Sequence, residues 1–189
     1  MFIASGGRAT VSFSVVAGNT APALGGGILD QGTLALRNVR VTGNTALNGG
    51  GLAVVAAHAT VSFSVLAGNS ASNNGGAVFN VGDLSVDHSR LDGNTAQAEG
   101  GGVDAQRSTT TRISSTIVAR NRAGGLGGGF ADLGGTMVLT GDRVVLNRGS
   151  AGGGIATGGN AAVALRFTLV ALNFPDNCSP RGAVRGCPH

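Results

Sequence analysis

The sequence predicts an all-β fold, a single right-handed parallel β-helix of about seven coils, and two repeated features support this prediction. The first is an asparagine that recurs at intervals of 25, 25, 25, 27, 26 and 26 residues. The second is a motif with the same period, usually a glycine triplet followed by an apolar residue. Internal periods of about 20–50 residues are typical of solenoids, in which each repeat forms one structural unit. The asparagines are Asn19, Asn44, Asn69, Asn94, Asn121, Asn147 and Asn173, and the glycine motifs begin at Gly25, Gly49, Gly75, Gly100, Gly127 and Gly152.

Apolar columns at fixed distances before each asparagine place short strands in every coil. The positions ten and eight before the asparagine are mostly apolar and share parity, so they point to one face of a strand. The position three before is always Val or Leu and breaks that parity, which requires a bend between two strands. Small residues, mostly alanine, stand two positions after the asparagine. We therefore expect coils of about 25 residues with three short strands each.

Leucine-rich repeats are the main alternative, because they have a similar period and an asparagine ladder. Their pattern requires a leucine five positions before the asparagine, and no segment between the ladders has helical periodicity. Val39 fits this pattern in the second coil, but the residues found at that position in the other six coils are polar: Ser14, Ser64, Ser89, Thr116, Asp142 and Thr168. A β-helix is therefore favoured.

The two ladders have a structural explanation. Stacked coils lie about 4.8 Å apart, so equivalent residues touch. An asparagine amide has donors and an acceptor, so a column of asparagines can form hydrogen bonds along the axis and satisfy groups of the turn. The glycines are expected either to have φ > 0 or to lie where coils approach too closely for a Cβ. The stretch Ala9–Val15 recurs as Ala59–Val65, which indicates growth of the array by copying two coils.

The two ends of the chain are expected to differ. The β-helix is predicted over residues 1–177, and residues 178–189 form a C-terminal cap. Cys178 and Cys187, the only cysteines, are expected to form a disulfide there, with two free thiols in a reducing compartment as the alternative. At the N-terminus no helix or polar segment precedes Ile3 to cover the first coil, which predicts either that Met1 is not the natural start of the domain or that the coil stack associates end to end.

Composition excludes some functions. The 35 glycines lack a G-X-Y period, which excludes a collagen triple helix. No apolar run approaches the length of a membrane span, so no transmembrane helix is expected. The net charge of +4 comes from arginines that are spread along a chain without Trp or Tyr, so a nucleic-acid partner is not expected. The sequence begins without the basic start and apolar region of a signal peptide.

The sequence gives little support for a catalytic site. Asp104 and Asp132 are the nearest to a carboxylate pair, but their positions relative to the glycine motifs put them on opposite faces of a strand. His58 is expected in a loop and His88 at a bend, and neither has a partner at metal-site or triad spacing. We therefore expect no catalytic residues, no metal ligands and no cofactor.

Two surface columns are candidates for binding. Arg40, Arg90 and Arg143 all stand four positions before their asparagine on alternate coils, so they would lie about 10 Å apart along one edge. This column is a possible surface for an anionic polymer. The second column carries hydroxyl groups, which ice-binding solenoids present in regular arrays: Thr20, Thr45, Ser70 and Thr95.

The glycine motif with an upstream asparagine, as in Gly75-Gly76-Ala77-Val78 after Asn69, resembles the repeats of polymorphic outer membrane proteins and other bacterial β-helix repeat proteins. The aromatic position of that family's F-x-x-N motif holds Val or Leu here. The C-terminal segment around Cys178 and Cys187 also resembles the end of secreted actinobacterial β-helix proteins. The resemblance implies export and display at the cell surface, with adhesion to a polysaccharide or other cell-surface ligand.

Three functions follow from these features. The leading hypothesis is a non-enzymatic extracellular scaffold or adhesin segment. The second is a polysaccharide lyase or hydrolase with a pectate-lyase-like fold. The third is a solenoid that binds ice or a polyanion.

Overall fold

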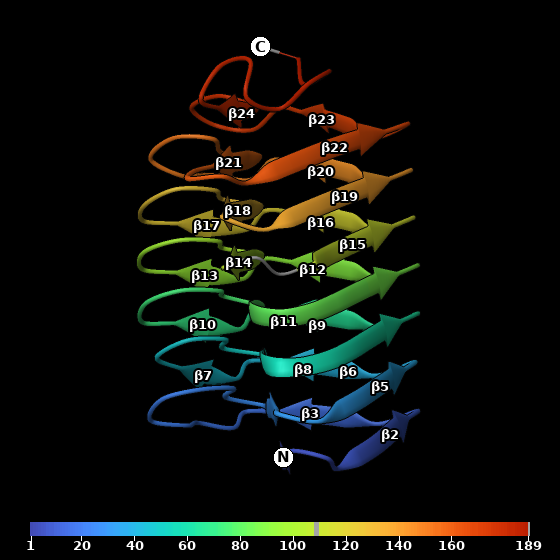
Figure 1. Cartoon of the computed structure of the whole chain (residues 1–189). Helices are drawn as coiled ribbons and strands as arrows, with labels where there is room; N and C mark the ends of the chain where they lie inside the picture. Colours follow the sequence, from blue (N-terminus) through green and yellow to red (C-terminus); the bar gives the residue numbers. More distant parts are fainter. Residues whose placement is uncertain (108–109, 189) are drawn as a thin grey trace.

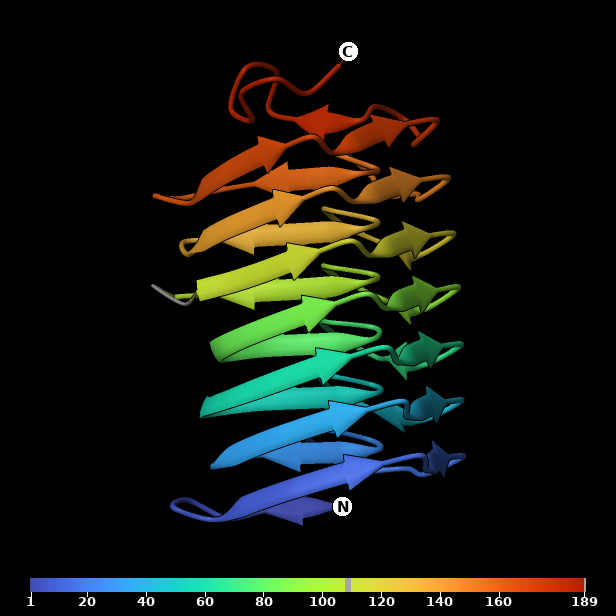
Figure 2. The same cartoon turned by 90° about the vertical axis from the view of Figure 1, so that its right-hand side faces the viewer.

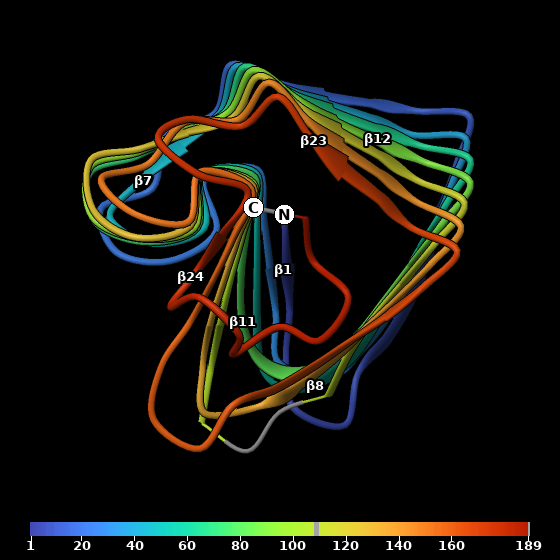
Figure 3. The same cartoon turned by 90° about the horizontal axis from the view of Figure 1, so that it is seen from above.

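The computed structural model describes residues 1–107 and 110–188, and it confirms the predicted architecture. The chain winds into a right-handed stack of parallel coils, seen from the side in Figure 1 and along the axis in Figure 3. Every strand pairs in parallel with the equivalent strands of adjacent coils, at the predicted spacing. Each of the seven coils contributes one strand to the seven-stranded sheet.

Four walls surround the axis, in chain order. The first and second walls together form a 13-stranded sheet, because β8 and β11 run through the corner that separates these walls in the other coils. The third wall is the seven-stranded sheet, and the fourth is a sheet of four very short strands. Figure 2 shows the strands of successive coils stacked in register from one end of the molecule to the other.

The strands have the following bounds. The first wall contains β1 (Phe2–Ile3), β4 (Ile28–Asp30), the start of β8 (Leu52–Ser62), the start of β11 (Val78–Asp87), β14 (Val103–Gln106), β18 (Phe130–Leu133), β21 (Ile155–Thr157) and β24 (Cys178–Ser179). The second wall contains β2 (Arg8–Ser12), β5 (Thr33–Arg37), the ends of β8 and β11, β15 (Thr110–Ser114), β19 (Thr136–Thr140) and β22 (Ala162–Arg166). The third wall contains β3 (Val15–Ala17), β6 (Arg40–Thr42), β9 (Val65–Ala67), β12 (Arg90–Asp92), β16 (Ile117–Ala119), β20 (Arg143–Val145) and β23 (Leu169–Ala171). The fourth contains β7 (Thr45–Ala46), β10 (Ser70–Ala71), β13 (Thr95–Ala96) and β17 (Arg122–Ala123).

Among the described residues, the expectation of three strands per coil holds for five of the seven coils, whereas the second and fifth coils have four. The fourth strand holds only two residues, such as Thr45–Ala46, directly after the ladder asparagine. Its alanine points inward and is buried, and the next residues form the loop that returns to the glycine motif. The column of small residues marks this strand, and its side chains are small because the coil turns tightly here.

The core consists of the predicted aliphatic columns. Leu36, Val61, Val86, Ile113 and Leu139 are neighbours in successive coils of the second wall, and each is about 1 % exposed or less. Each such side chain contributes roughly 1.5–3 kcal/mol when it is fully buried. One coil cannot enclose these side chains alone, so the stability of the fold comes from contacts between coils.

The asparagine ladder is confirmed in atomic detail. The Nδ2 group of Asn69 donates to Oδ1 of Asn94, at 3.0 Å, and to the carbonyl oxygen of Val41, at 2.9 Å. The backbone N–H of Asn69 also donates to Oδ1 of Asn94, at 2.9 Å. The pattern repeats from coil to coil, and Asn177 completes it by accepting hydrogen bonds from Asn173. The ladder therefore satisfies turn groups that the coil would otherwise bury without partners.

The glycine triplets meet both expectations, at different positions. The first glycine of each triplet has a positive φ, as at Gly100 with φ 63°. The next glycine lies against backbone of the adjacent coil: a Cβ on Gly101 would lie 2.5 Å from the carbonyl oxygens of Arg122 and Gly128. Glycine is therefore required at two positions of the motif: at the first because φ is positive, and at the second because a Cβ has no room.

The two ends are covered differently. A disulfide joins Cys178 to Cys187, and Val184 between them is buried against the last coil. At the other end β1, β2 and β3 each pair with one neighbouring strand only. Ile3 is 5 % exposed there, whereas Val11 and Val16 are half-buried.

The residue just before each ladder asparagine has a left-handed conformation in every coil. It is glycine in the first four coils, and a Cβ at any of these glycines would meet nothing within 4 Å. In the last three coils it is Arg120, Leu146 or Leu172, with φ between 54° and 59°. Both leucines are exposed, Leu172 by 76 %. Because exposed side chains gain little from packing, their backbone strain is not offset within the chain.

We expect Leu172→Gly to stabilise the fold by up to about 1 kcal/mol, because glycine adopts this conformation without a steric penalty. Urea unfolding measures the change. The matched control is Leu169→Gly on the same coil, where the strand conformation is ordinary and glycine is expected to destabilise. A loss of stability in both variants would contradict the assignment of strain to position 172.

Candidate functional site

The predicted arginine column lies on the outer face of the third wall. Arg40, Val65 and Arg90 are neighbours in successive coils, and the same alternation continues through Ile117 to Arg143. The three arginines therefore lie two coils apart, about 10 Å, as expected. Arg90 is less exposed than expected, because its guanidinium lies 3.3 Å from the carboxylate of Asp92.

The residues between the arginines were not predicted as part of this surface. They are aliphatic and they also recur every second coil: Val15, Val65, Ile117 and Leu169. Val15 is 67 % exposed and Leu169 is 49 % exposed. The third wall thus presents alternating apolar and cationic coils. This pattern follows from the two-coil period of the sequence, which puts different side chains on odd and even coils.

The corner between the second and third walls repeats the alternation. Its residues have positive φ, and in odd coils three of them are phenylalanines: Phe13, Phe63 and Phe167. Phe167 is 98 % exposed. Phe63 lies between the guanidinium of Arg37, 5.0 Å from the ring centre, and the ring of His88, stacked at 5.1 Å. The predicted bend at His88 is thus part of an aromatic and cationic edge beside the third wall.

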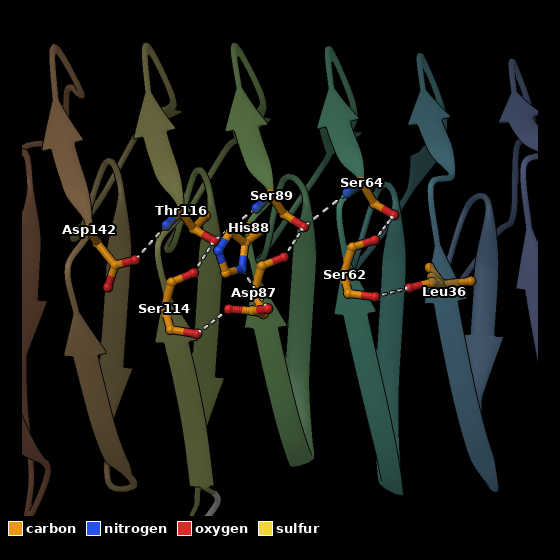
Figure 4. Close-up of polar contacts among 9 residues, drawn as sticks. All are labelled: Leu36, Ser62, Ser64, Asp87, His88, Ser89, Ser114, Thr116 and Asp142. Carbon is orange, nitrogen blue, oxygen red and sulfur yellow. Dashed lines mark hydrogen bonds and ion pairs between the residues drawn. The ribbon is translucent and has the colours of Figure 1, made fainter.

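A second polar ladder follows this corner, and sequence reasoning missed it. The backbone N–H of Ser64 donates to Oγ of Ser89 at 3.0 Å, and the N–H of Ser89 donates to Oγ1 of Thr116 at 3.2 Å (Figure 4). Each of these hydroxyls also donates to the carbonyl oxygen two residues earlier, as Ser64 does to Ser62 at 2.7 Å. The polar column that argues against leucine-rich repeats is therefore a structural ladder.

His88 makes a polar contact beside this ladder. Its Nδ1 lies 2.7 Å from Oδ2 of Asp87, and Oδ1 of Asp87 accepts a hydrogen bond from Oγ of Ser114 at 2.6 Å (Figure 4). These two contacts lower the pKa of Asp87, with the serine hydroxyl as the larger cause. The carboxylate lies between the serine and the histidine, so this is not the arrangement of a serine nucleophile with its base.

Asp142 occupies one position in the hydroxyl ladder. Its Oδ1 accepts the N–H of Thr116 at 2.8 Å, whereas its buried Oδ2 has no partner among the described residues. Burial raises the pKa of this carboxyl to about 6. The hydrogen bond from the N–H of Thr116 favours the charged form and opposes this shift, so burial, and not the ladder, favours the neutral form.

Asp104 and Asp132 were predicted to lie on opposite faces of a strand, and the register agrees. In the register of the first wall, Asp104 is the neighbour of Ala131 and Asp132 is the neighbour of Ala105, so the two occupy alternate positions along their strands. Both are fully buried. Burial, and then the nearby charge of Glu99, raise the pKa of Asp104 to about 8. Oδ1 of Asp132 accepts the N–H of Gly135 in the corner turn, at 2.8 Å.

The buried carboxyls predict an unusual pH dependence. Because the pKa values of Asp142 and Asp104 in the folded chain exceed the ordinary value of 3.8, the folded state binds more protons than the unfolded state. Their contribution to stability is complete below about pH 4 and is lost as the pH rises through 6 and 8. We expect the free energy of unfolding to fall between pH 5 and pH 8.5, measured by urea unfolding.

Asp142→Thr isolates one of these groups, because Thr116 and Thr168 already occupy the same column. The variant is expected to gain about 1–2 kcal/mol relative to the parent at pH 8, and less at pH 5. A gain of equal size at both pH values would show that ionisation of Asp142 is not its cause.

His58 is not in a loop, as the sequence suggested, but within β8, where its side chain points outward. The continuous strand passes through the corner because Ala56 adopts a positive φ of 51° in place of a turn. His58 Nδ1 lies 3.1 Å from Oδ2 of Asp83 on the next coil. This pair borders a hollow of about 310 Å³ at the corner of the first and second walls.

The predicted hydroxyl column exists on the fourth wall. Thr20, Thr45, Ser70 and Thr95 are neighbours in successive coils. The next two positions of the column are arginines, Arg122 and Arg148. The second position of each short strand is an inward alanine, so this wall presents one hydroxyl column rather than an array.

Within residues 1–107 and 110–188, no three metal-ligating side chains gather into a metal-binding group. The same residues include no helix long and apolar enough to cross a membrane. No family model, no curated protein and no solved structure matches the chain.

Proposed function

We propose that the chain is a non-enzymatic scaffold whose third wall binds an anionic polymer, such as an acidic polysaccharide, outside the cell. The observation that carries the proposal is the alternation of apolar and cationic coils along this wall. The buried polar groups, by contrast, serve the coils themselves, because the two ladders bond one coil to the next.

The geometry of the third wall suits a repeating ligand. Its arginines recur about every 10 Å, the half-buried side chains of Val65 and Ile117 lie between them, and the exposed side chains of Val15 and Leu169 lie at the two ends of the column. An acidic sugar chain has the matching chemistry, because each unit combines anionic or hydroxyl groups with an apolar ring face. The guanidinium groups can pair with the acidic groups, and Val15, Val65, Ile117 and Leu169 can pack against ring faces. Several weak contacts on one rigid face add through multivalency.

The disulfide supports a location outside the cytoplasm. Disulfides persist in oxidising compartments and are uncommon in cytosolic proteins. The bond between Cys178 and Cys187 closes the cap over the last coil, where both sulfurs are buried. A coil stack whose end is closed by a disulfide is suited to display on a cell surface.

Binding to dextran sulfate, with neutral dextran as the matched polymer, tests the proposed function. We expect the parent to bind the sulfated polymer with an affinity that falls as salt rises. Replacing Arg40, Arg90 and Arg143 by Gln is expected to weaken binding by at least about tenfold, since each lost charge contact contributes of the order of 1 kcal/mol. Surface plasmon resonance measures both effects.

The control variant removes the same charge from another wall. Arg8, Arg112 and Arg166 lie on the outer face of the second wall and are exposed, so their replacement by Gln also removes three positive charges. Equal weakening in the two triple variants would show that net charge alone accounts for the binding, and it would overturn the assignment to the third wall. Shortening of an acidic polysaccharide during incubation, measured by size-exclusion chromatography, would favour the enzyme alternative.

A further inference from the structure

A hollow lies at the corner between the first and second walls, and the proposed scaffold function does not use it. It has a volume of about 310 Å³ and is lined by Ala56, Ala57, His58, Val81, Gly82, Asp83 and Arg107. Its size is at the lower end of small-molecule sites, which are typically about 300–1,000 Å³. It therefore has room for a ligand of a few heavy atoms up to a single sugar unit.

The hollow exists because small residues meet there. Ala56 and Ala57 lie in one coil and Gly82 in the next, where β11 shows an irregular register against β8 between Val81 and Asp83. A Cβ on Gly82 would lie 2.5 Å from the carbonyl oxygen of Ala57, so this position admits no side chain. The floor is consequently backbone and methyl groups, and the functional groups stand at the rim.

Two non-glycine residues at the same corner have a left-handed backbone conformation. In the second, fourth and sixth coils an Asp or Asn side chain accepts the N–H of a glycine in the corner turn, as Asn80 does from Gly82 at 3.0 Å. In the third and fifth coils Ala56 and Arg107 instead hold positive φ values of 51° and 56°. Such conformations cost non-glycine residues about 1–2 kcal/mol and are frequent at binding sites.

The rim combines a cation with a histidine–carboxylate pair. Asp83 holds Nδ1 of His58 at 3.1 Å, which leaves Nε2 as the ring nitrogen available to a ligand. The His58 side chain is 70 % exposed and the Asp83 side chain 48 %, so both are accessible from the solvent. The guanidinium of Arg107, also exposed, supplies a forked donor of the kind that matches a carboxylate.

We propose that this hollow binds a hydroxycarboxylate, either a free 2-hydroxy acid or a sugar acid. The carboxylate pairs with Arg107, and a hydroxyl of the ligand bonds to His58 Nε2, whose tautomer Asp83 fixes. The apolar remainder of the ligand lies against Ala56 and Val81. A simple carboxylate lacks the second contact and a neutral sugar lacks the first, so the ligand must carry both groups.

NMR titration of the folded chain with four probes tests the proposal: L-lactate, D-glucuronate, propionate and glucose. We expect lactate or glucuronate to shift the ring signals of His58 in a saturable manner, with propionate and glucose at least about tenfold weaker. A response to lactate alone identifies free hydroxy acids as the ligand class, and a response to glucuronate alone identifies sugar acids. Equal responses to propionate and lactate, or no saturable response to either hydroxycarboxylate, would overturn the proposal.

Matched variants locate the site. Arg107→Gln is expected to weaken binding about tenfold, in line with the loss of one charge-assisted hydrogen bond. Arg112→Gln, on the exposed face of β15, removes the same charge from the neighbouring surface and is expected to leave the affinity unchanged. Equal weakening by both variants would contradict the assignment of the carboxylate to Arg107. The triple variant of the third wall is expected to bind the probe normally, so failure of either proposal leaves the other intact.

Discussion

Asn94→Leu is expected to lower the free energy of unfolding by about 3–5 kcal/mol, a large effect for one side chain of the ladder. Asn94 is fully buried and takes part in four hydrogen bonds through its side chain. A leucine of similar size removes all four and leaves two donors of Asn69, the carbonyl oxygen of Leu66 and Oδ1 of Asn121 buried without these partners. Each such group costs about 1–3 kcal/mol, partly relieved by local rearrangement.

Two controls separate the ladder from other effects. Asn19→Leu makes the same substitution in the exposed first coil, where the side chain donates two hydrogen bonds and accepts none from a preceding coil among the described residues. Its expected cost is about 1 kcal/mol. Arg90→Ala is expected to cost less than Asn94→Leu, because the ion pair with Asp92 is partly solvated. Urea midpoints for Asn94→Leu and Asn19→Leu that coincide would contradict the role assigned to the buried ladder.

The sequence predicts the ladder, the coil number and the core columns because each depends on identity between coils. A parallel stack places equivalent residues in contact, so a repeated side chain such as Asn69 or Val86 identifies the residues that it contacts in the adjacent coils. The strand of the fourth wall was missed because it contributes only two residues, and a small inward residue such as Ala71 also fits a tight turn. The hydroxyl ladder was missed because Ser64, Thr116 and Asp142 differ chemically, although the side-chain oxygen of each accepts a hydrogen bond from the equivalent N–H of the preceding coil.

The surfaces are less predictable than the core for a physical reason. The arginine column could be read from the sequence, because Arg40, Arg90 and Arg143 share one offset from the asparagine. The hollow could not, because it depends on local departures from the repeat, namely the positive φ of Ala56 and Arg107 and the irregular register near Gly82. A repeat predicts what all coils share, whereas a site of this kind forms where one coil differs from its neighbours.

Gly101→Ala is expected to destabilise the fold by more than about 4 kcal/mol or to prevent folding, although it adds a single methyl group. The added Cβ would lie 2.5 Å from the carbonyl carbon and oxygen of Arg122 and from the carbonyl oxygen of Gly128, and all of these are backbone atoms. A flexible side chain can move aside, but these atoms are fixed by hydrogen bonds between coils, such as that from the N–H of Gly101 to Gly127 at 3.1 Å. Relief of the clash therefore requires the coils to separate, which breaks contacts along several walls at once.

Gly93→Ala is the matched control, since it adds the same methyl group to a glycine eight residues away. At Gly93 the φ of 62° is unfavourable for alanine, but a Cβ would meet nothing within 4 Å. Only the conformational cost of about 1 kcal/mol is then expected, so Gly93→Ala folds and unfolds cooperatively at a slightly lower urea concentration. Circular dichroism during urea unfolding compares the two variants with the parent. If Gly101→Ala lost no more stability than Gly93→Ala, the glycine triplet would be a conformational requirement alone, and the close approach of coils would not limit the sequence at that position.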